Sequence, residues 1–201
     1  MGLRKFIQSL FGTRASHAAN KEADPDDLFG MSTAHVTMHA EVGYESVKKA
    51  GICFSDFDST KFEQLVDDAR SMAEIGDDST IATKTTDDHG YDWIIVEDDD
   101  FESLVSSLYT ITDEFMTQGY GSRLIAAVFG FTTTEGQRAY WIYSFKQGSF
   151  YPFCPENNVN DRESAREGKL KQILDGELDI EEDRGYWYPI WPSTPGNHPW
   201  E

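Results

Sequence analysis

The chain has little that would support membrane insertion or disulfide cross-linking. Its 201 residues include only two cysteines, Cys53 and Cys154, which show no metal-type spacing, so we interpret both as reduced thiols of a cytoplasmic protein. No run approaches the roughly 18 consecutive apolar residues that a membrane-spanning helix needs. The apolar run from Phe6 to Phe11 is also too short for a signal peptide.

Basic residues are scarce as well. The chain has 17 lysines and arginines against 36 aspartates and glutamates, a formal charge of -19. A nucleic-acid role is excluded, because no basic surface is available to match a phosphate backbone. The acidic excess is similar to that of proteins from salt-in halophilic archaea, where surface charge keeps proteins soluble.

Catalytic motifs are missing too. There is no Walker loop, no GxGxxG and no serine nucleophile elbow. His35 and His39 would share one face of a predicted strand, but no further ligand lies at a suitable spacing. The sequence therefore predicts no catalytic residue, no metal site and no cofactor.

One segment offers an alternative. Asp56 and Asp58, in DFDST after an apolar run, resemble the nucleophile loop of haloacid-dehalogenase-type phosphohydrolases. There the first carboxylate attacks phosphorus and the second acts as acid and base beside Mg²⁺. The competing interpretation is that Asp58 or Ser59 caps a helix that begins at Thr60.

The residues that are present indicate an α+β domain. We expect strands at 33–40, 50–54, 79–86, 91–97, 124–131 and 140–147, and helices after Thr60, after Asp100 and from Asp161 to about Leu174. Short turns between neighbouring strands favour an antiparallel sheet with helices packed mainly on one face. Residues 28–201 are predicted to form this single domain, and residues 13–27 a flexible linker.

A short amphipathic helix is predicted before the linker, within residues 1–12. Residues 1–21 carry four basic side chains and no acidic one. Such a helix could lie on a membrane surface, dock into a partner or simply pack on the domain. Its predicted contact residues are Leu3, Arg4, Lys5, Phe6, Ile7, Leu10 and Phe11.

Aromatic residues are concentrated between Tyr140 and Pro155. They alternate up to Gln147, as on a pleated strand, and Gly148 then permits a bend. A second aromatic cluster, from Tyr186 to Pro192, is predicted to cover the same core, because large rings are rarely left exposed.

These blocks carry a family resemblance. The segments MGL, SLFG, GICF, YDW, VFGF, YSFKQGSFYPFCP, IEED and WYPIW resemble those of the PspAB family, PspA-associated protein B, across nearly the whole chain. The chain departs from the family at Gln147, where an arginine is usual, and at Cys154, where an alanine is usual. Both departures argue against a charged catalytic centre in this loop.

The resemblance implies a non-enzymatic accessory role in a phage-shock envelope-stress response. The implied partners are a PspA-like protein and an HtpX-type membrane protease, and the implied location is the cytoplasm. Peripheral contact at the inner face of the membrane is expected only from the basic N-terminal helix. The residues proposed for a shared binding surface are Lys146, Tyr151, Arg162, Trp187 and Tyr188. The alternative is that the rings belong to the core and Arg162 pairs with a nearby carboxylate.

Overall fold

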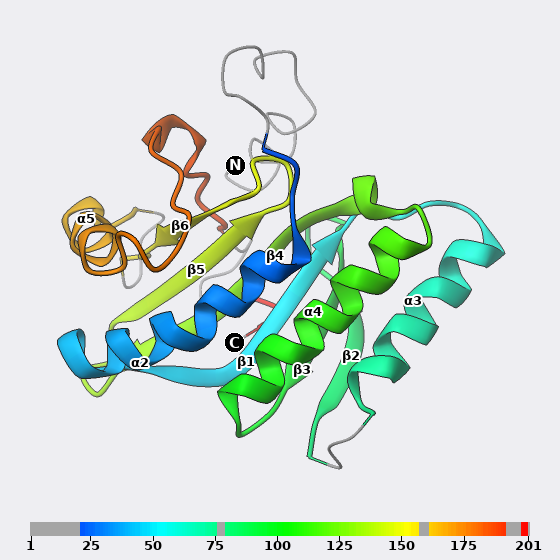
Figure 1. Cartoon of the computed structure of the whole chain (residues 1–201), viewed down its shortest axis with the longest axis horizontal. Coiled ribbons are helices and arrows are strands. Elements are labelled where there is room, and N and C mark those ends of the chain that lie inside the picture. The colour runs from blue at the N-terminus through cyan, green and yellow to red at the C-terminus, as the bar shows by residue number, and fades with distance from the viewer. Residues whose placement is uncertain (1–20, 76–78, 157–160, 192–197, 201) are drawn as a thin grey trace.

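The computed structural model describes residues 21–75, 79–156, 161–191 and 198–200 (Figure 1). The predicted N-terminal helix lies outside these residues. The helices are α2 (Gly30–Val42), α3 (Thr60–Ala73), α4 (Phe101–Thr117) and α5 (Ser164–Ile173), with 3-10 turns η1 (Pro25–Phe29), η2 (Gly121–Arg123) and η3 (Arg184–Tyr186). The strands are β1 (Tyr44–Phe54), β2 (Ile81–Thr86), β3 (Asp92–Glu97), β4 (Leu124–Thr133), β5 (Arg138–Ser144) and β6 (Ser149–Phe153).

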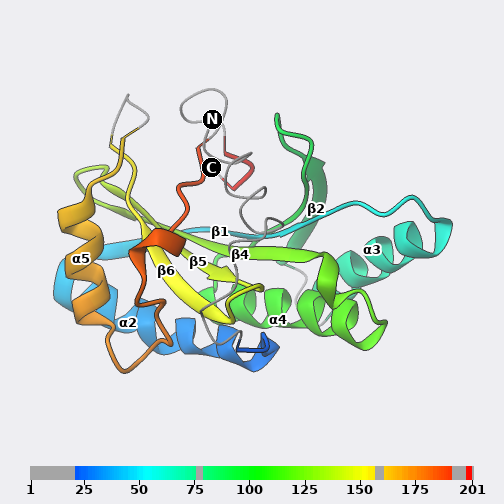
Figure 2. The same cartoon turned by 90° about the horizontal axis from the view of Figure 1, so that it is seen from above.

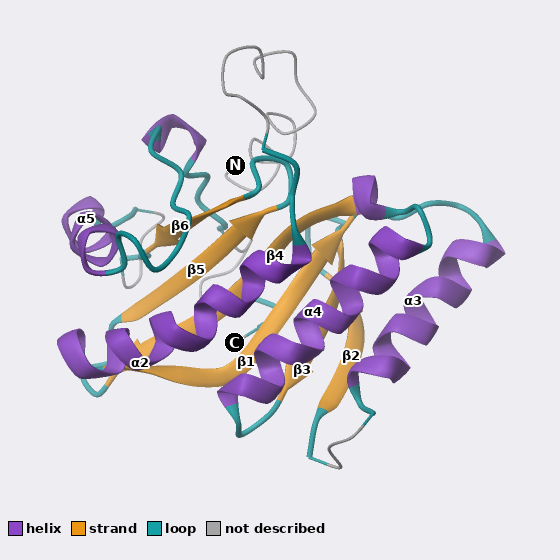
Figure 3. Ribbon diagram, in the orientation of Figure 1, coloured by secondary structure: helices purple, strands orange, loops and turns teal. Residues whose placement is uncertain are grey.

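The six strands form one sheet in the order β2-β3-β1-β4-β5-β6 (Figure 3). Every neighbouring pair is antiparallel. Helices α2, α3 and α4 cover one face of this sheet, as Figures 1 and 2 show from two sides. The predicted α+β class, with an antiparallel sheet and helices mainly on one face, is therefore confirmed.

Two of these helices begin where their caps predict. The hydroxyl of Ser59 accepts a hydrogen bond from the Phe62 amide at the start of α3, and the carboxylate of Asp100 accepts one from the Glu102 amide at the start of α4. Their buried positions recur every three or four residues, so both helices turn an apolar face to the sheet.

The C-terminal segment covers the opposite face of the sheet. The Trp200 ring packs 4.8 Å from Trp93 of β3 and 5.6 Å from Tyr140 of β5, between ring centroids. The Trp191 ring lies 4.8 Å from Phe153 of β6. The two aromatic clusters thus share one core, as their composition predicted.

One predicted element is wrong. Residues 33–40, expected as a strand, lie in the middle of helix α2. The helix ends at Gly43, whose φ of 68° is left-handed and whose N–H bonds to the carbonyl of His39. Strand β1 is correspondingly longer than the predicted 50–54. Its polar first half contains a bulge, with Lys48 at φ 63°, which hides the strand pattern.

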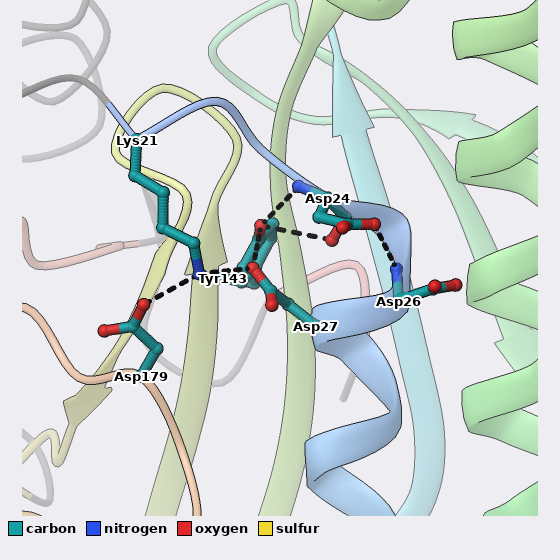
Figure 4. A network of polar contacts seen from close by, with 6 residues as sticks. All are labelled: Lys21, Asp24, Asp26, Asp27, Tyr143 and Asp179. Atoms are coloured by element: carbon teal, nitrogen blue, oxygen red, sulfur yellow. Dashed lines mark hydrogen bonds and ion pairs between the residues drawn. The ribbon is translucent and has the colours of Figure 1, made fainter.

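The described part of the predicted linker contacts the domain (Figure 4). The Lys21 ammonium lies 2.9 Å from an Asp27 carboxylate oxygen and 2.7 Å from one of Asp179. The Tyr143 hydroxyl donates to Asp27 at 2.9 Å and accepts from the Asp24 amide at 3.1 Å. Residues 21–27 are therefore fixed against β5 and the segment before η3. The domain boundaries themselves stay a prediction.

Candidate functional site

Four of the five predicted binding residues gather beside β6, at its C-terminal end. Arg162, just before α5, donates from Nε to both carboxylate oxygens of Glu167, at 2.9 and 3.0 Å. Its Nη1 donates to the Trp187 carbonyl at 2.6 Å. Nη2 lies 2.9 Å from Glu167 Oε1, which is ion-pair distance, but it makes no hydrogen bond among the described residues. Arg162 is thus occupied by groups of its own domain.

Glu167 is the residue that sequence reasoning missed. Its side chain is almost fully buried in the first turn of α5, and Oε1 also accepts the Cys154 amide at 3.0 Å. The carboxylate therefore ties together β6, α5 and, through Arg162, the C-terminal segment. The acidic residue five positions after Arg162 was visible in the sequence, but nothing marked it as buried among so many other acids.

The two reactive groups at this end of β6 are held in their protonated forms. Tyr151 is buried, and burial raises the pKa of its hydroxyl, which has no hydrogen-bond partner among the described residues. Burial also raises the pKa of the Cys154 thiol to about 12. Since only a thiolate is a good nucleophile, Cys154 is not prepared for covalent chemistry at neutral pH.

The two C-terminal aromatic residues differ in exposure. Trp187 is buried, its indole N–H donates to the Glu181 carbonyl at 2.8 Å, and the Arg184 guanidinium lies 4.9 Å from its ring centroid. Tyr188 is half-buried. In this arrangement the rings of Tyr151 and Trp187 belong to the core, which is the alternative that the sequence left open.

Lys146 lies away from this cluster, in the turn between β5 and β6. It is half-buried beside a pocket of about 590 Å³ that Met116 and Phe145 also line. Burial lowers the pKa of its ammonium group. The structure therefore does not join all five predicted residues into one surface, and their role in binding stays a prediction.

The Asp56 and Asp58 loop follows β1 and is exposed. Asp56 accepts the amide of Phe57 at 2.8 Å, and Ser59 rather than Asp58 caps α3. β1 lies between two antiparallel neighbours, whereas the phosphohydrolase loop follows a strand of a parallel sheet. Within the described ranges, no group of three or more His, Cys, Asp or Glu side chains is arranged to hold a metal ion.

His35 and His39 lie one turn apart on helix α2 rather than on a strand. Together with the start of α4 they line a groove of about 520 Å³. The His35 ring stacks on Phe101 with 4.3 Å between centroids, and burial and the nearby His39 lower its pKa. Carboxylates of four residues line the same groove: Glu45, Asp99, Asp100 and Glu102.

The residues predicted to contact a membrane, 2–11, lie outside the described part of the chain. Within the described part of the chain, no helix is long and apolar enough to cross a membrane.

Comparison with known proteins gives the family. No curated protein and no solved structure matches the chain. The model of the family PspAB, PspA associated protein B, matches residues 1–200, which is nearly the full length. The chain therefore belongs to the PspA associated protein B family.

Proposed function

We propose that this chain is a non-enzymatic adaptor of a PspA-type envelope-stress response, which works by binding a PspA-like protein. The observation that carries the proposal is the family match over residues 1–200, since the family is named for its association with PspA. The side chains described above support it, because Arg162 is engaged internally and the Cys154 thiol is protonated at neutral pH.

The proposal places the protein in the cytoplasm, with peripheral contact at the inner face of the membrane. The contact would be made by residues 2–11, whose apolar side chains would lie on one face of a helix with Arg4 and Lys5 opposite. An HtpX-type membrane protease is proposed as a second partner. The acidic body would be repelled by anionic lipid, so membrane contact should depend on this basic segment.

Binding to the purified PspA-like protein of the same organism tests the adaptor role directly. We expect a saturable complex by isothermal titration calorimetry at native salt. Absence of a complex over the accessible concentration range would contradict the proposal.

Vesicle co-sedimentation tests the membrane contact. Replacing Arg4 and Lys5 by glutamate should reduce binding to anionic vesicles at low salt. Replacing Lys61 and Lys169, two exposed lysines of the body, by glutamate is the charge-matched control and should leave binding nearly unchanged. Equal losses in both variants would show that net charge, and not the segment, decides binding.

The phosphohydrolase alternative is tested separately. Turnover of p-nitrophenyl phosphate with Mg²⁺ that disappears in Asp56→Asn would show that the protein is an enzyme. We expect no turnover from either protein.

A further inference from the structure

Helix α2 has apolar residues on two opposite sides. The inner side is formed by Met31, Ala34 and Met38, which are fully buried against the domain. The outer side of α2 also carries apolar residues, and polar side chains lie between the two sides. Exposed apolar residues that follow one another along a helix are a candidate contact surface for another protein.

Four residues form this outer side, which we call the α2 seam: Thr33, Val36 and Ala40 of α2, and Phe29, the last residue of η1, whose ring lies 4.8 Å from that of Tyr109 on α4. All four are exposed, Val36 at 62% and Phe29 at 42%. Their four-three-four spacing is that of the contact positions of paired helices. In Figures 1 and 2 no described element lies over the side of α2 that faces away from the sheet.

The surroundings of the seam are acidic. Val36 lines the groove between α2 and the start of α4, together with the four groove carboxylates. One of these, on Asp99, is paired with Lys48 at 2.7 Å, and Glu102 accepts a hydrogen bond from Ser32 of α2 at 2.6 Å. The groove therefore keeps a net negative charge beside an apolar strip.

We infer that the α2 seam binds a basic amphipathic helix of a partner protein. Apolar side chains of that helix would pack on Phe29, Thr33, Val36 and Ala40, and its lysines or arginines would face the groove carboxylates. The seam covers about 17 Å along the helix axis, which corresponds to about three turns of a partner helix. A second copy of this acidic chain is disfavoured as the occupant, because the two groove linings would repel each other.

This inference rests on the proposed adaptor function and names the surface through which it would act. Its test therefore has one arm that does not depend on PspA. The full-length protein is titrated with a fluorescent Leu/Lys amphipathic model peptide, followed by fluorescence anisotropy at low salt. The acidic Leu/Glu counterpart of the peptide measures apolar binding without charge complementarity.

The key variant is Val36→Gln, and the matched control is Ile75→Gln. Both residues are exposed and apolar, but Ile75, 77% exposed, lies just after α3 and outside the seam. Neither replacement changes the net charge. Losing burial of one valine should weaken binding of the Leu/Lys peptide about tenfold in Val36→Gln, and the control should bind like the wild type. Higher salt should weaken the wild-type complex.

Equal affinity of Val36→Gln, Ile75→Gln and the wild type for the Leu/Lys peptide would overturn the inference. So would equal binding of the Leu/Glu peptide. Self-association of the wild type that is lost in Val36→Gln would identify a second copy as the occupant. Tighter peptide binding after Arg4→Glu and Lys5→Glu than after Lys61→Glu and Lys169→Glu would identify the chain's own N-terminal segment as the occupant. Either this result or self-association would contradict a partner helix.

The second arm repeats the titration with the purified PspA-like protein. If the peptide distinguishes Val36→Gln from its control but the wild type does not bind the PspA-like protein, the seam stands and the adaptor function fails. If the PspA-like protein binds both variants equally, the adaptor function stands and this surface is wrong.

Discussion

At the scale of single residues, the ion pair of Arg162 with the buried Glu167 links β6 and α5 to the C-terminal segment. Glu167→Gln keeps the shape of the side chain but leaves the Arg162 charge without its counterion. Because Arg162 is partly exposed, we expect a loss of about 2–3 kcal/mol in the free energy of unfolding, somewhat below the range for fully buried pairs. Urea denaturation measures this loss.

The control for Glu167→Gln is Glu182→Gln. Glu182 also pairs with a lysine, Lys171, but its side chain is 78% exposed. Surface pairs of this kind contribute about 0–1 kcal/mol. Similar costs for the two variants would mean that the Arg162 pair is not the anchor that its geometry indicates.

The surroundings of Arg162 show how much of the candidate site could be predicted from the sequence. The gathering of Tyr151, Arg162, Trp187 and Tyr188 follows from the aromatic pattern and the family resemblance. The partner of Arg162 could not be predicted, because pairing with Glu167 depends on where α5 packs against β6. The sequence places Lys146 in the same aromatic block as Tyr151, yet strand β6 separates Lys146 from the other residues.

At the scale of elements, the two outer strands of the sheet are protected in different ways. At β6, the Phe150 amide donates to the Asp179 carbonyl, and the Phe150 carbonyl accepts from the Glu181 amide. At β2, side chains rather than backbone groups form the hydrogen bonds to the outer edge. Arg70 donates to the Ala82 carbonyl at 3.2 Å, and Glu74 accepts the Ala82 amide at 2.8 Å. Both side chains come from α3.

We predict that replacing Arg70 and Glu74 by alanine exposes the edge of β2. Unpaired edge strands add to one another, so the double variant should self-associate at concentrations where the wild type is monodisperse. Sedimentation velocity over a concentration series measures this. Lys61→Ala with Asp67→Ala, which removes one basic and one acidic side chain elsewhere on α3, should not self-associate. A monodisperse Arg70 and Glu74 variant would contradict the protective role.

Helix α2 shows why one element was predicted wrongly. Ala34, Val36, Met38 and Ala40 are apolar at every second position, which is the strand pattern. In the structure Ala34 and Met38 point inward and Val36 and Ala40 outward. The alternation thus arises from two apolar sides of one helix, and Gly43 was the local signal for its end. The long, one-sided helices α3 and α4 were predicted correctly because their patterns are not mixed in this way.

At the scale of the whole molecule, burial raises the pKa of several tyrosine hydroxyls and cysteine thiols. Burial is the main cause of a raised pKa at five groups: Tyr44, Tyr143, Tyr151, Cys53 and Cys154. In the unfolded chain these groups ionise near their ordinary pKa values of 9.0 for cysteine and 10.0 for tyrosine. Above about pH 9 the folded state therefore holds more protons than the unfolded state.

Stability should consequently be complete below pH 9 and fall as the pH rises through the higher pKa values of the folded state. Each group contributes a slope of at most about 1.4 kcal/mol per pH unit, so several groups together make alkaline unfolding steep. Thermal unfolding between pH 7 and 11 at constant ionic strength measures the effect. Cys154→Ala lacks one of these groups, and its stability should fall less steeply above pH 9 whatever its stability at pH 7. An unchanged melting temperature up to pH 11 would mean that these groups ionise in the folded protein, and that water reaches their buried side chains.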